Sequence, residues 1–387
     1  MENVLIIGGG HVGSTLAVDM YGRRHETNID PHLIIIKPDN HPFFKENDPL
    51  QFSMENILSG ETLSASFPKS NLHHFGSDLS DLFSKCAAVI LTVPDIPVLR
   101  EKLLQYIQAS PMAAGSTVAF VRAGQGGQIA LIDKWRKNAK LRSMHLLLVE
   151  DSFYGTRCIN SIIEFKRKKV TRVAIPGDDR VSALSLFERI FSGHAIGPEE
   201  HRFELVRPLD LQFDPLGYII HLAVAFDSEN LIRTRRGEQY LHYSDGVHEG
   251  NSDLIEALDR ERVKLAGAFG ARTRLFTDML TEQYGIPQQK TFLAMIKSTR
   301  SIYRSLSEPS LGRLKTGRII SEDYPGLLTM NWLTSVSGEN YASTNQFVSS
   351  INEVLTALQV KTDHLKGYQQ YLDSLKINKQ SITDLLN

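Results

Sequence analysis

Cysteine is nearly absent from this sequence: Cys86 and Cys158 are the only two among 387 residues. Two isolated cysteines supply neither a disulfide framework nor a zinc cluster, so we expect reduced packing residues and no metal site. Long apolar runs are missing too. No run of about 18 apolar residues occurs, and the first apolar stretch, Val4 to Ile7, is too short for a secretory signal core. We therefore expect no membrane partner and a cytoplasmic location.

An excess of charge of either sign is also lacking. The 43 Lys and Arg residues against 44 Asp and Glu give a formal net charge of -1, which excludes a global field that would attract nucleic acid or anionic lipid. Hydrophobic residues at 42% and charged residues at 22% are typical of a folded chain. A length of 387 residues predicts two domains, each with its own core.

Short, unalternated apolar runs indicate a parallel sheet in the first half of the chain. They cover residues 3–7, 32–36, 87–93, 117–121 and 145–149, and helical stretches at 96–110 and 127–139 separate the later ones. Strands that alternate with helices predict a doubly wound Rossmann sheet covered on both faces. Two further apolar runs flank the basic turn Lys166 to Lys169, and we interpret residues 160–176 as a hairpin appended to this sheet.

From about residue 180 the pattern becomes mostly helical. We predict an α/β protein with an NADP-binding Rossmann domain at residues 1–185 and a mostly α-helical substrate and catalytic domain at residues 186–387. The long helical C-terminal region fits a homodimer interface, although in a single sequence helical amphipathicity more often means an intramolecular core.

A glycine-rich motif, Gly8-Gly9-Gly10-His11-Val12-Gly13, lies between the first strand and the first helix. In this pattern Gly8 permits the tight turn, Gly10 lets a diphosphate approach the backbone, and Gly13 allows the helix to pack closely on the strand. The N-terminus of the helix then offers N–H groups and partial positive charge to the phosphates. We expect this segment, with His11 and Val12, to bind a dinucleotide.

The preference among dinucleotides depends on the residue that follows the second strand. Lys37 stands where an NAD-specific site usually has Asp or Glu, and a lysine attracts a 2'-phosphate, so NADP(H) is the predicted cofactor. In the alternative interpretation Lys37 is solvated and Asp39 binds the ribose. Thr92 and Pro94, and Gly124 in the next loop, follow later strands at the ligand-binding edge and are further candidates for the cofactor site.

Two segments of the helical region carry candidate chemistry. His221 lies in an otherwise apolar helical stretch, where a lone histidine is more often a satisfied core group than a catalyst. Asp323 belongs to Ser-Glu-Asp before Tyr324, which also suits a helix N-terminal cap. By themselves these residues do not decide between a structural and a catalytic role.

Taken together, the motifs resemble the octopine and nopaline dehydrogenase family. The resemblance rests on the GGGHVG motif, the basic segment IIEFKRKKVTRVAIP, the histidine in the first helix after the boundary and an Arg-x-x-x-x-Asp segment. Its most specific pieces are SFYGTR (152–157), LGYIIH (216–221), EQYGIP (282–287) and SEDY (321–324). Within the family the sequence looks most similar to the opine metallophore dehydrogenases of the staphylopine and pseudopaline type.

The resemblance implies a reductive condensation, in which an amino acid and a 2-oxo acid form an imine that NADPH reduces. It implies that His221 is the acid/base residue and that Asp323 orients the imidazole, roles that agree with histidine chemistry near neutral pH. Arg318 and Arg157 are the candidates for the substrate carboxylates, because arginine binds carboxylates in a bidentate fashion. The staphylopine-type enzymes have an aspartate between the residues aligned with Gly155 and Thr156, and this sequence lacks it.

Two alternatives remain open at this stage. The first is another NADP-dependent reductase with a helical second domain, such as a ketopantoate reductase or a 3-hydroxyacid dehydrogenase, which would rely on a lysine such as Lys264 or Lys297. The second is a non-catalytic NADP-binding sensor, which needs the glycine motif alone. The identities of the amino acid and of the 2-oxo acid do not follow from the sequence, because pocket shape sets them.

Overall fold

The computed structural model describes residues 1–39, 41–121, 128–177, 180–192, 201–299, 304, 306–361 and 363–387. The chain divides into two compact units. Unit 1 consists of Met1–Val93, Glu101–Arg122 and Lys134–Arg207, and unit 2 of Pro94–Arg100, Ala123–Asp133 and Pro208–Asn387. The main division therefore falls at Arg207, whereas the predicted domains meet at residues 185 and 186.

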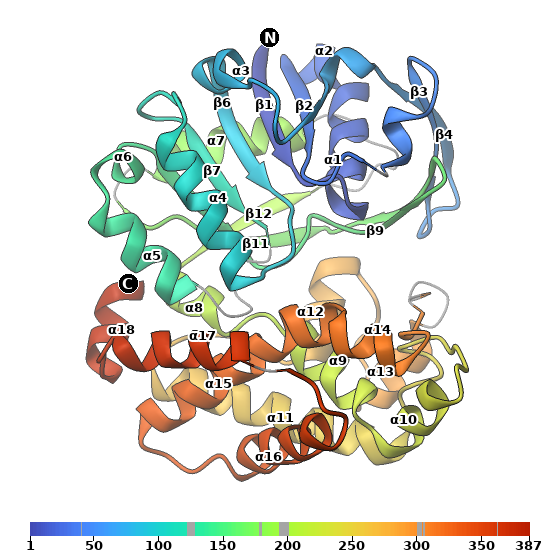
Figure 1. Cartoon of the computed structure of the whole chain (residues 1–387), viewed down its shortest axis with the longest axis vertical. Coiled ribbons are helices and arrows are strands. Elements are labelled where there is room, and N and C mark those ends of the chain that lie inside the picture. Colours follow the sequence, from blue (N-terminus) through green and yellow to red (C-terminus); the bar gives the residue numbers. More distant parts are fainter. Residues whose placement is uncertain are drawn as a thin grey trace. The chain divides into compact units, whose positions relative to one another are not determined.

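Unit 1 is built on an eight-stranded sheet of order β12-β11-β8-β7-β6-β1-β2-β5 (Figure 1). The strands from β8 to β5 in this order run parallel, β11 pairs antiparallel with β8, and β12 is parallel to β11. The central strands are buried on both faces, as their continuous apolar runs predict. The strand bounds are Glu2–Ile7 (β1), Ile29–Ile35 (β2), Leu72–His74 (β5), Cys86–Leu91 (β6), Thr117–Phe120 (β7), His145–Val149 (β8), Val170–Ala174 (β11) and Arg202–Val206 (β12).

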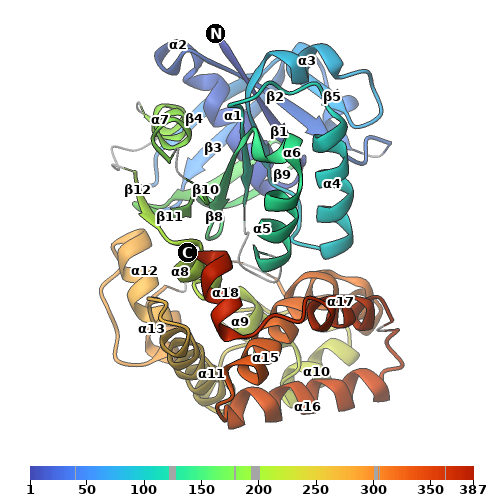
Figure 2. The same ribbon diagram turned by 90° about the vertical axis from the view of Figure 1, so that its left-hand side faces the viewer.

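Helices lie on both sides of this sheet, with α4 and α6 on one side and α7 on the other (Figure 2). The parallel sheet with alternating helices confirms the predicted α/β fold class. The helical bounds in this part of the chain are His11–Gly22 (α1), Arg24–Thr27 (α2), Ser80–Lys85 (α3), Pro97–Ala109 (α4), Gln128–Lys137 (α5), Ala139–Arg142 (α6) and Arg180–Phe191 (α7), with short 3-10 turns at Pro42–Phe44 (η1) and Lys69–Asn71 (η2).

A second, four-stranded sheet of order β4-β3-β10-β9 also belongs to unit 1. Its strands are Leu50–Asn56 (β3), Thr62–Phe67 (β4), Tyr154–Ile159 (β9) and Ile162–Arg167 (β10). This sheet packs on α1, where the Thr15 and Thr156 hydroxyls lie 2.7 Å apart and the rings of Tyr21 and Phe67 meet edge to face. Helix α1 is therefore held by both sheets.

The hairpin predicted across the basic turn is wrong in its pairing. β10 pairs with β9 and β3 in the second sheet, whereas β11 pairs with β8 and β12 in the first. The chain crosses from one sheet to the other at Lys168, which is buried and whose N–H donates to the carbonyl of Phe153. The hairpin that is present joins β9 and β10. The basic run is therefore no turn signal here, because the side chains of Lys166, Arg167 and Lys168 are buried and only that of Lys169 is exposed.

Unit 2 is mostly helical. Its elements are Pro208–Gln212 (α8), Gly217–Ala225 (α9), Ser228–Arg235 (α10), Glu249–Ala268 (α11), Phe276–Tyr284 (α12), Phe292–Ser298 (α13), Leu311–Thr316 (α14), the π-helix Ile319–Asp323 (η3), Tyr324–Ser337 (α15), Ala342–Ala357 (α16), Asp363–Ser374 (α17) and Lys379–Leu386 (α18). Helix α11 lies at its centre and contacts α9, α13, α15 and α16.

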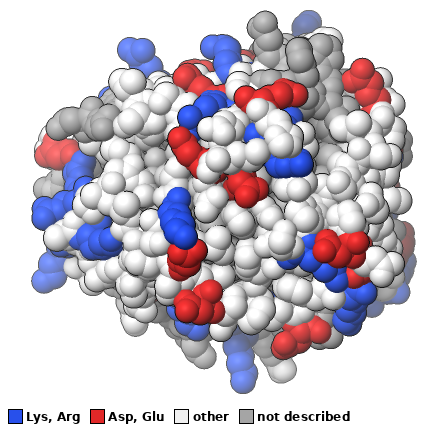
Figure 3. Space-filling model, turned by 90° about the horizontal axis from the view of Figure 1, so that it is seen from above, with Lys and Arg blue, Asp and Glu red and all other residues white. Residues whose placement is uncertain are grey.

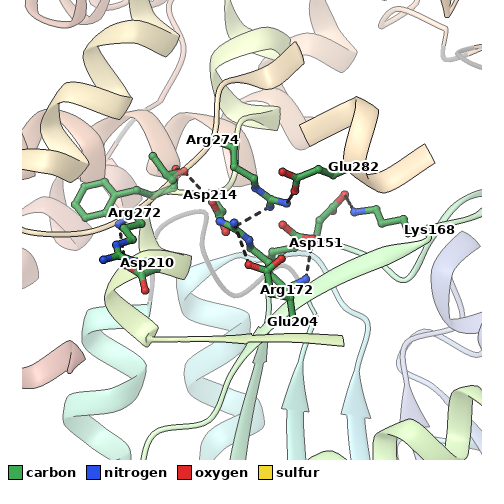
Figure 4. A network of polar contacts seen from close by, with 12 residues as sticks. Asp151, Lys168, Arg172, Glu204, Asp210, Asp214, Arg272, Arg274 and Glu282 are labelled. Atoms are coloured by element: carbon green, nitrogen blue, oxygen red, sulfur yellow. Dashed lines mark hydrogen bonds and ion pairs between the residues drawn. The ribbon is translucent and has the colours of Figure 1, made fainter. Parts of the chain in front are cut away.

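Buried ion pairs tie the helices of unit 2 together. The fully buried Arg262 binds Asp259 at 2.7 Å and Thr273 at 2.7 Å. Beside it, Arg274 pairs with Asp214 at 3.6 Å and with Glu282 at 2.5 Å (Figure 4). Because a buried guanidinium must have its N–H groups satisfied, these contacts fix the bend between α11 and α12.

Unit 1 has ion pairs of its own, between Lys168 and Asp151 at 3.2 Å and between Arg172 and Glu204 at 3.1 Å (Figure 4). On the face drawn in Figure 3, acidic and basic side chains are intermixed, in keeping with the balanced composition. None of the helices that the structure describes is long and apolar enough to cross a membrane.

Candidate active site

The glycine motif forms a tight turn between β1 and α1. Gly8 has a φ of +123°, which an L side chain rarely adopts, and Gly10 is the N-cap of α1. A Cβ atom at Gly13 would lie 1.8 Å from the carbonyl oxygen of Gly8, whereas a Cβ atom at Gly10 would meet nothing within 4 Å. The first turn of α1 carries no acidic residue, so its partial positive charge is not neutralised there. The turn has the close packing and the open approach that a diphosphate requires.

Two side chains hold this turn in place. The Thr92 hydroxyl lies 3.1 Å from the carbonyl oxygen of Gly8 and 3.2 Å from that of Ile7. On the other side, the Nε2 atom of His41 lies 2.9 Å from the carbonyl oxygen of Gly9. Thr92 was predicted as a cofactor residue, whereas His41 was not, because a single histidine after the second strand carries no recognisable motif.

The remaining candidates for the cofactor site have different placements. Lys37 lies after β2 and is exposed, as is Asp39, and Val12 is half-buried in the first turn of α1. Pro94 belongs to the short segment Pro94–Arg100 that clusters with unit 2. Gly124 lies outside the residues that the structure describes.

His11 and Arg157 lie near each other in unit 1. The backbone N–H of Cys158 donates to the Nδ1 atom of His11 at 3.1 Å, which places strand β9 against the first residue of α1. Burial lowers the pKa of His11, and the positive charge of Arg157 lowers it further. Arg157 therefore adds positive charge close to the glycine turn.

Unit 2 brings together His221 and Asp323, which are 102 residues apart in sequence. The Nδ1 atom of His221, on α9, lies 3.0 Å from Oδ2 of Asp323. The Asp323 side chain is completely buried and that of His221 is 12% exposed. The other ring nitrogen, Nε2, lies 2.7 Å from the hydroxyl of Tyr243. An ionised aspartate on Nδ1 fixes the orientation and the tautomer of the imidazole.

Asp323 ends the π-helix η3, and Arg318 precedes it as its N-cap residue. The Nε atom of Arg318 lies 3.0 Å from Glu322 and 3.7 Å from Asp323, and its side chain is 39% exposed. No side chain caps the backbone at the start of η3 or of α15. The acidic pair is therefore directed at Arg318 and His221, and the alternative of a simple helix cap is not what the structure shows.

A second histidine, His242, lies beside this group. Its ring centroid is 5.4 Å from that of His221, and 5.3 Å from that of its neighbour Tyr243. Burial, with the nearby His221 as a smaller cause, lowers the pKa of His242 to about 3. The imidazole beside His221 is therefore neutral near pH 7.

The structure thus brings together His221, Asp323 and Arg318 in unit 2, and the glycine motif, Thr92 and Arg157 in unit 1. The sequence-based reasoning missed Tyr243, His242, Glu322 and His41, for which the chain offers no spacing signal. Lys264 and Lys297, the candidates of the rival reductase hypothesis, lie elsewhere: Lys264 is mostly exposed and pairs with Glu339, and Lys297 is exposed.

Comparison with protein families gives one decisive match. Residues 206–355 match the family described as NAD/NADP octopine/nopaline dehydrogenase, alpha-helical domain. The helical region belongs to the octopine/nopaline dehydrogenase family. This match over residues 206–355 confirms the resemblance inferred from the motifs. The comparison with curated proteins gives no match.

Solved structures share the fold over nearly the whole chain. An octopine dehydrogenase in complex with NADH and agmatine has a TM-score of 0.69 at 17% identity and covers 92% of this chain and 90% of its own. Yersinopine dehydrogenase without ligand has a TM-score of 0.66 at 14% identity, with 94% and 93% covered. A 2-dehydropantoate 2-reductase from Geobacter metallireducens has a TM-score of 0.56 at 12% identity, with 91% and 99% covered. At these identities the likeness shows the fold.

Proposed function

We propose that this protein is an NADPH-dependent opine dehydrogenase of the metallophore-forming type, which joins the amine of an amino acid to the carbonyl carbon of a 2-oxo acid and reduces the resulting imine. The observation that carries the proposal is the contact of 3.0 Å between His221 and Asp323 inside the region that matches the dehydrogenase family. A rival reductase would need a catalytic lysine, and its candidates Lys264, which pairs with Glu339, and Lys297 are both exposed.

The roles of the two units follow from their sites. Unit 1 binds NADP(H) through the glycine motif, with the diphosphate at Gly10 and the N-terminus of α1. Lys37 is exposed and follows β2, and a lysine at this position would pair with the 2'-phosphate of NADP(H). Solved relatives in this fold class were obtained with NADH, and with arginine or pyruvate in addition, which supports a nicotinamide cofactor and this class of substrates. When bound, the cofactor supplies the hydride for the imine carbon.

The residues of unit 2 serve the proton transfers. Attack of the amine on the carbonyl gives a carbinolamine, which must lose water to form the imine, and both steps require a group that exchanges protons near neutral pH. His221 is that group, and Asp323 stabilises its charged form. Arg318 binds a substrate carboxylate, because its guanidinium is partly exposed while its Nε is held by Glu322. Among the described residues no cluster of His, Cys, Asp or Glu is suited to a metal ion.

A matrix of amino acids against 2-oxo acids, read by oxidation of NADPH or NADH in each well, tests the proposal. We expect NADPH oxidation that requires both substrates, and a secondary amine in the mass spectrum of the product. Replacing His221 by Asn should reduce kcat by about 10²–10⁴-fold, the usual contribution of a general acid or base. Lys264→Ala is the control. The opine dehydrogenase hypothesis predicts that Lys264→Ala keeps its kcat, whereas the rival hypothesis predicts that Lys264→Ala loses kcat and that the His221 variant keeps it. Turnover of a 2-oxo acid without any amine would contradict the proposal.

A further inference from the structure

Both ring nitrogens of His221 already have partners in the protein. Nδ1 faces the buried Asp323 carboxylate at 3.0 Å, and Nε2 faces the Tyr243 hydroxyl at 2.7 Å. A carboxylate only accepts hydrogen bonds when ionised, so Nδ1 carries the proton that it donates to Asp323. In the neutral ring Nε2 is then an acceptor, and the Tyr243 O–H donates to it. The three side chains form a continuous chain of hydrogen bonds.

This arrangement decides how His221 can exchange protons with a substrate. Asp323 takes one nitrogen and Tyr243 takes the other, so a proton can leave or reach the ring only through the tyrosine hydroxyl unless Tyr243 first moves away. Tyr243 is half-buried, whereas Asp323 has no exposed surface. Of the two outer members of this chain of hydrogen bonds, Tyr243 is therefore the one with exposed surface.

Packing and backbone contacts fix the position of the Tyr243 ring. Its ring meets those of His242 and His221 edge to face, at centroid distances of 5.3 and 5.9 Å. Its carbonyl accepts from the N–H of Val247 at 3.2 Å, and the turn that follows is tight, because a Cβ atom at Gly246 would lie 2.4 Å from the carbonyl oxygen of His242. These contacts oppose a swing of the ring and favour transfer through the hydroxyl.

We propose that Tyr243 is a catalytic residue and the terminal member of a proton relay Asp323–His221–Tyr243. The inference rests on the proposed function and deepens it. In the dehydration step the Tyr243 O–H bond breaks and its proton goes to the leaving hydroxyl of the carbinolamine. The C–O bond breaks with its electron pair on the departing water, and the nitrogen lone pair forms the C=N bond. The proton on Nε2 of His221, which the ring took up through Tyr243 from the amine nitrogen when the carbinolamine formed, then restores the phenol and leaves the ring neutral, so that no further reactant is needed.

The test compares the Tyr243→Phe enzyme with the wild type and with Tyr341→Phe as a matched control. Tyr341 is a buried tyrosine of unit 2 whose hydroxyl contacts Glu339. We expect Tyr243→Phe to lose about 10²-fold or more in kcat, with the KM values of the amino acid, the 2-oxo acid and NADPH changed by less than about threefold. The solvent deuterium isotope effect on kcat should also fall, because fewer protons move in the step. Tyr341→Phe should keep the kcat and the solvent isotope effect of the wild type.

A second measurement does not depend on turnover. In the unliganded protein, the 15N chemical shift of His221 Nε2 should change in Tyr243→Phe and stay constant in Tyr341→Phe, because only the first variant removes its hydrogen bond. An unchanged shift, an unchanged kcat, or an increased kcat would overturn the relay, and an increase would show that Tyr243 is a gate. If the wild type turns over no pair of amino acid and 2-oxo acid, the proposed function itself fails, and the relay with it.

Discussion

His242 should make unit 2 sensitive to acid. It is buried beside His221, its Nε2 atom has no hydrogen-bond partner among the residues that the structure describes, and burial lowers its pKa to about 3. The charged groups that face it are Asp323, which favours its protonation, and Arg318, which opposes it together with His221. In the unfolded chain a histidine has a pKa of about 6.5.

The loss of folding stability on acidification can be calculated from these two pKa values of His242. Between pH 6.5 and pH 3 the unfolded chain binds a proton at this residue and the folded protein does not, so acidification favours unfolding in that window. Above pH 6.5 the stability is fully present. At pH 5 the loss is about 2 kcal/mol, and any folded pKa well below 5 gives the same figure, because only the unfolded side chain is then protonated.

The perturbation is His242→Gln, which removes the titration. Trp332 lies in α15 of unit 2, and the other tryptophan, Trp135, lies in unit 1. In a Trp135→Phe background the fluorescence therefore reports on unit 2. Urea unfolding at pH 7.5 and pH 5 should show that His242→Gln loses about 2 kcal/mol less stability than its parent. The exposed His25, replaced by Gln, is the control and should follow the parent. Equal losses in His242→Gln and in the parent would refute this reasoning.

Three further predictions concern the substrate and cofactor sites. Gly10→Ala should fold with an unchanged melting temperature and lose NADPH affinity. Gly13→Ala should destabilise unit 1 itself, because there is no room for its Cβ atom. Melting curves with and without NADPH distinguish these two effects. Lys37→Glu should lower kcat/KM for NADPH roughly ten- to a hundredfold and leave that for NADH unchanged; equal losses with both cofactors would speak against a 2'-phosphate contact. Arg318→Lys should raise the KM of a substrate that carries a carboxylate. Arg157, which the family resemblance also assigned to a substrate carboxylate, lies beside the first residue of α1, so Arg157→Lys should instead raise the KM of NADPH. Steady-state kinetics with each reactant varied in turn distinguishes the two outcomes.

The parallel sheet was predictable because each central strand is buried on both faces and therefore reads as an unbroken apolar run. The second sheet was not. β3 alternates buried and exposed residues, and β4 is mostly exposed, so neither forms an apolar run of the kind that marks a buried strand. The pairing of β10 failed for a related reason. Two neighbouring apolar runs suggest a hairpin, but nothing local shows that the partners of β10 lie about 100 residues earlier, in β3.

The candidate sites also differ in how far they could be predicted from the sequence. The glycine motif is local, and its backbone chemistry can be derived from six consecutive residues. His221 and Asp323 came from the family resemblance, because their contact joins residues 102 positions apart and no periodicity links them. Tyr243 had no signal at all, since it lies in a turn after α10 and meets His221 only in the folded unit.

The π-helix η3 explains how one short segment serves two partners. In an α-helix a residue and the fifth after it are separated by about 140° around the axis, because 3.6 residues complete a turn. In a π-helix the turn is wider, because each hydrogen bond spans five residues, so Asp323 lies nearer to the side of Arg318 than it would in an α-helix. The Nε of Arg318 accordingly reaches both Glu322, at 3.0 Å, and Asp323, at 3.7 Å. The same Oδ2 atom of Asp323 faces the His221 ring. An α-helical turn here would direct Asp323 away from Arg318, so the wider turn is what lets one carboxylate pair with the histidine while its charge is shared with an arginine.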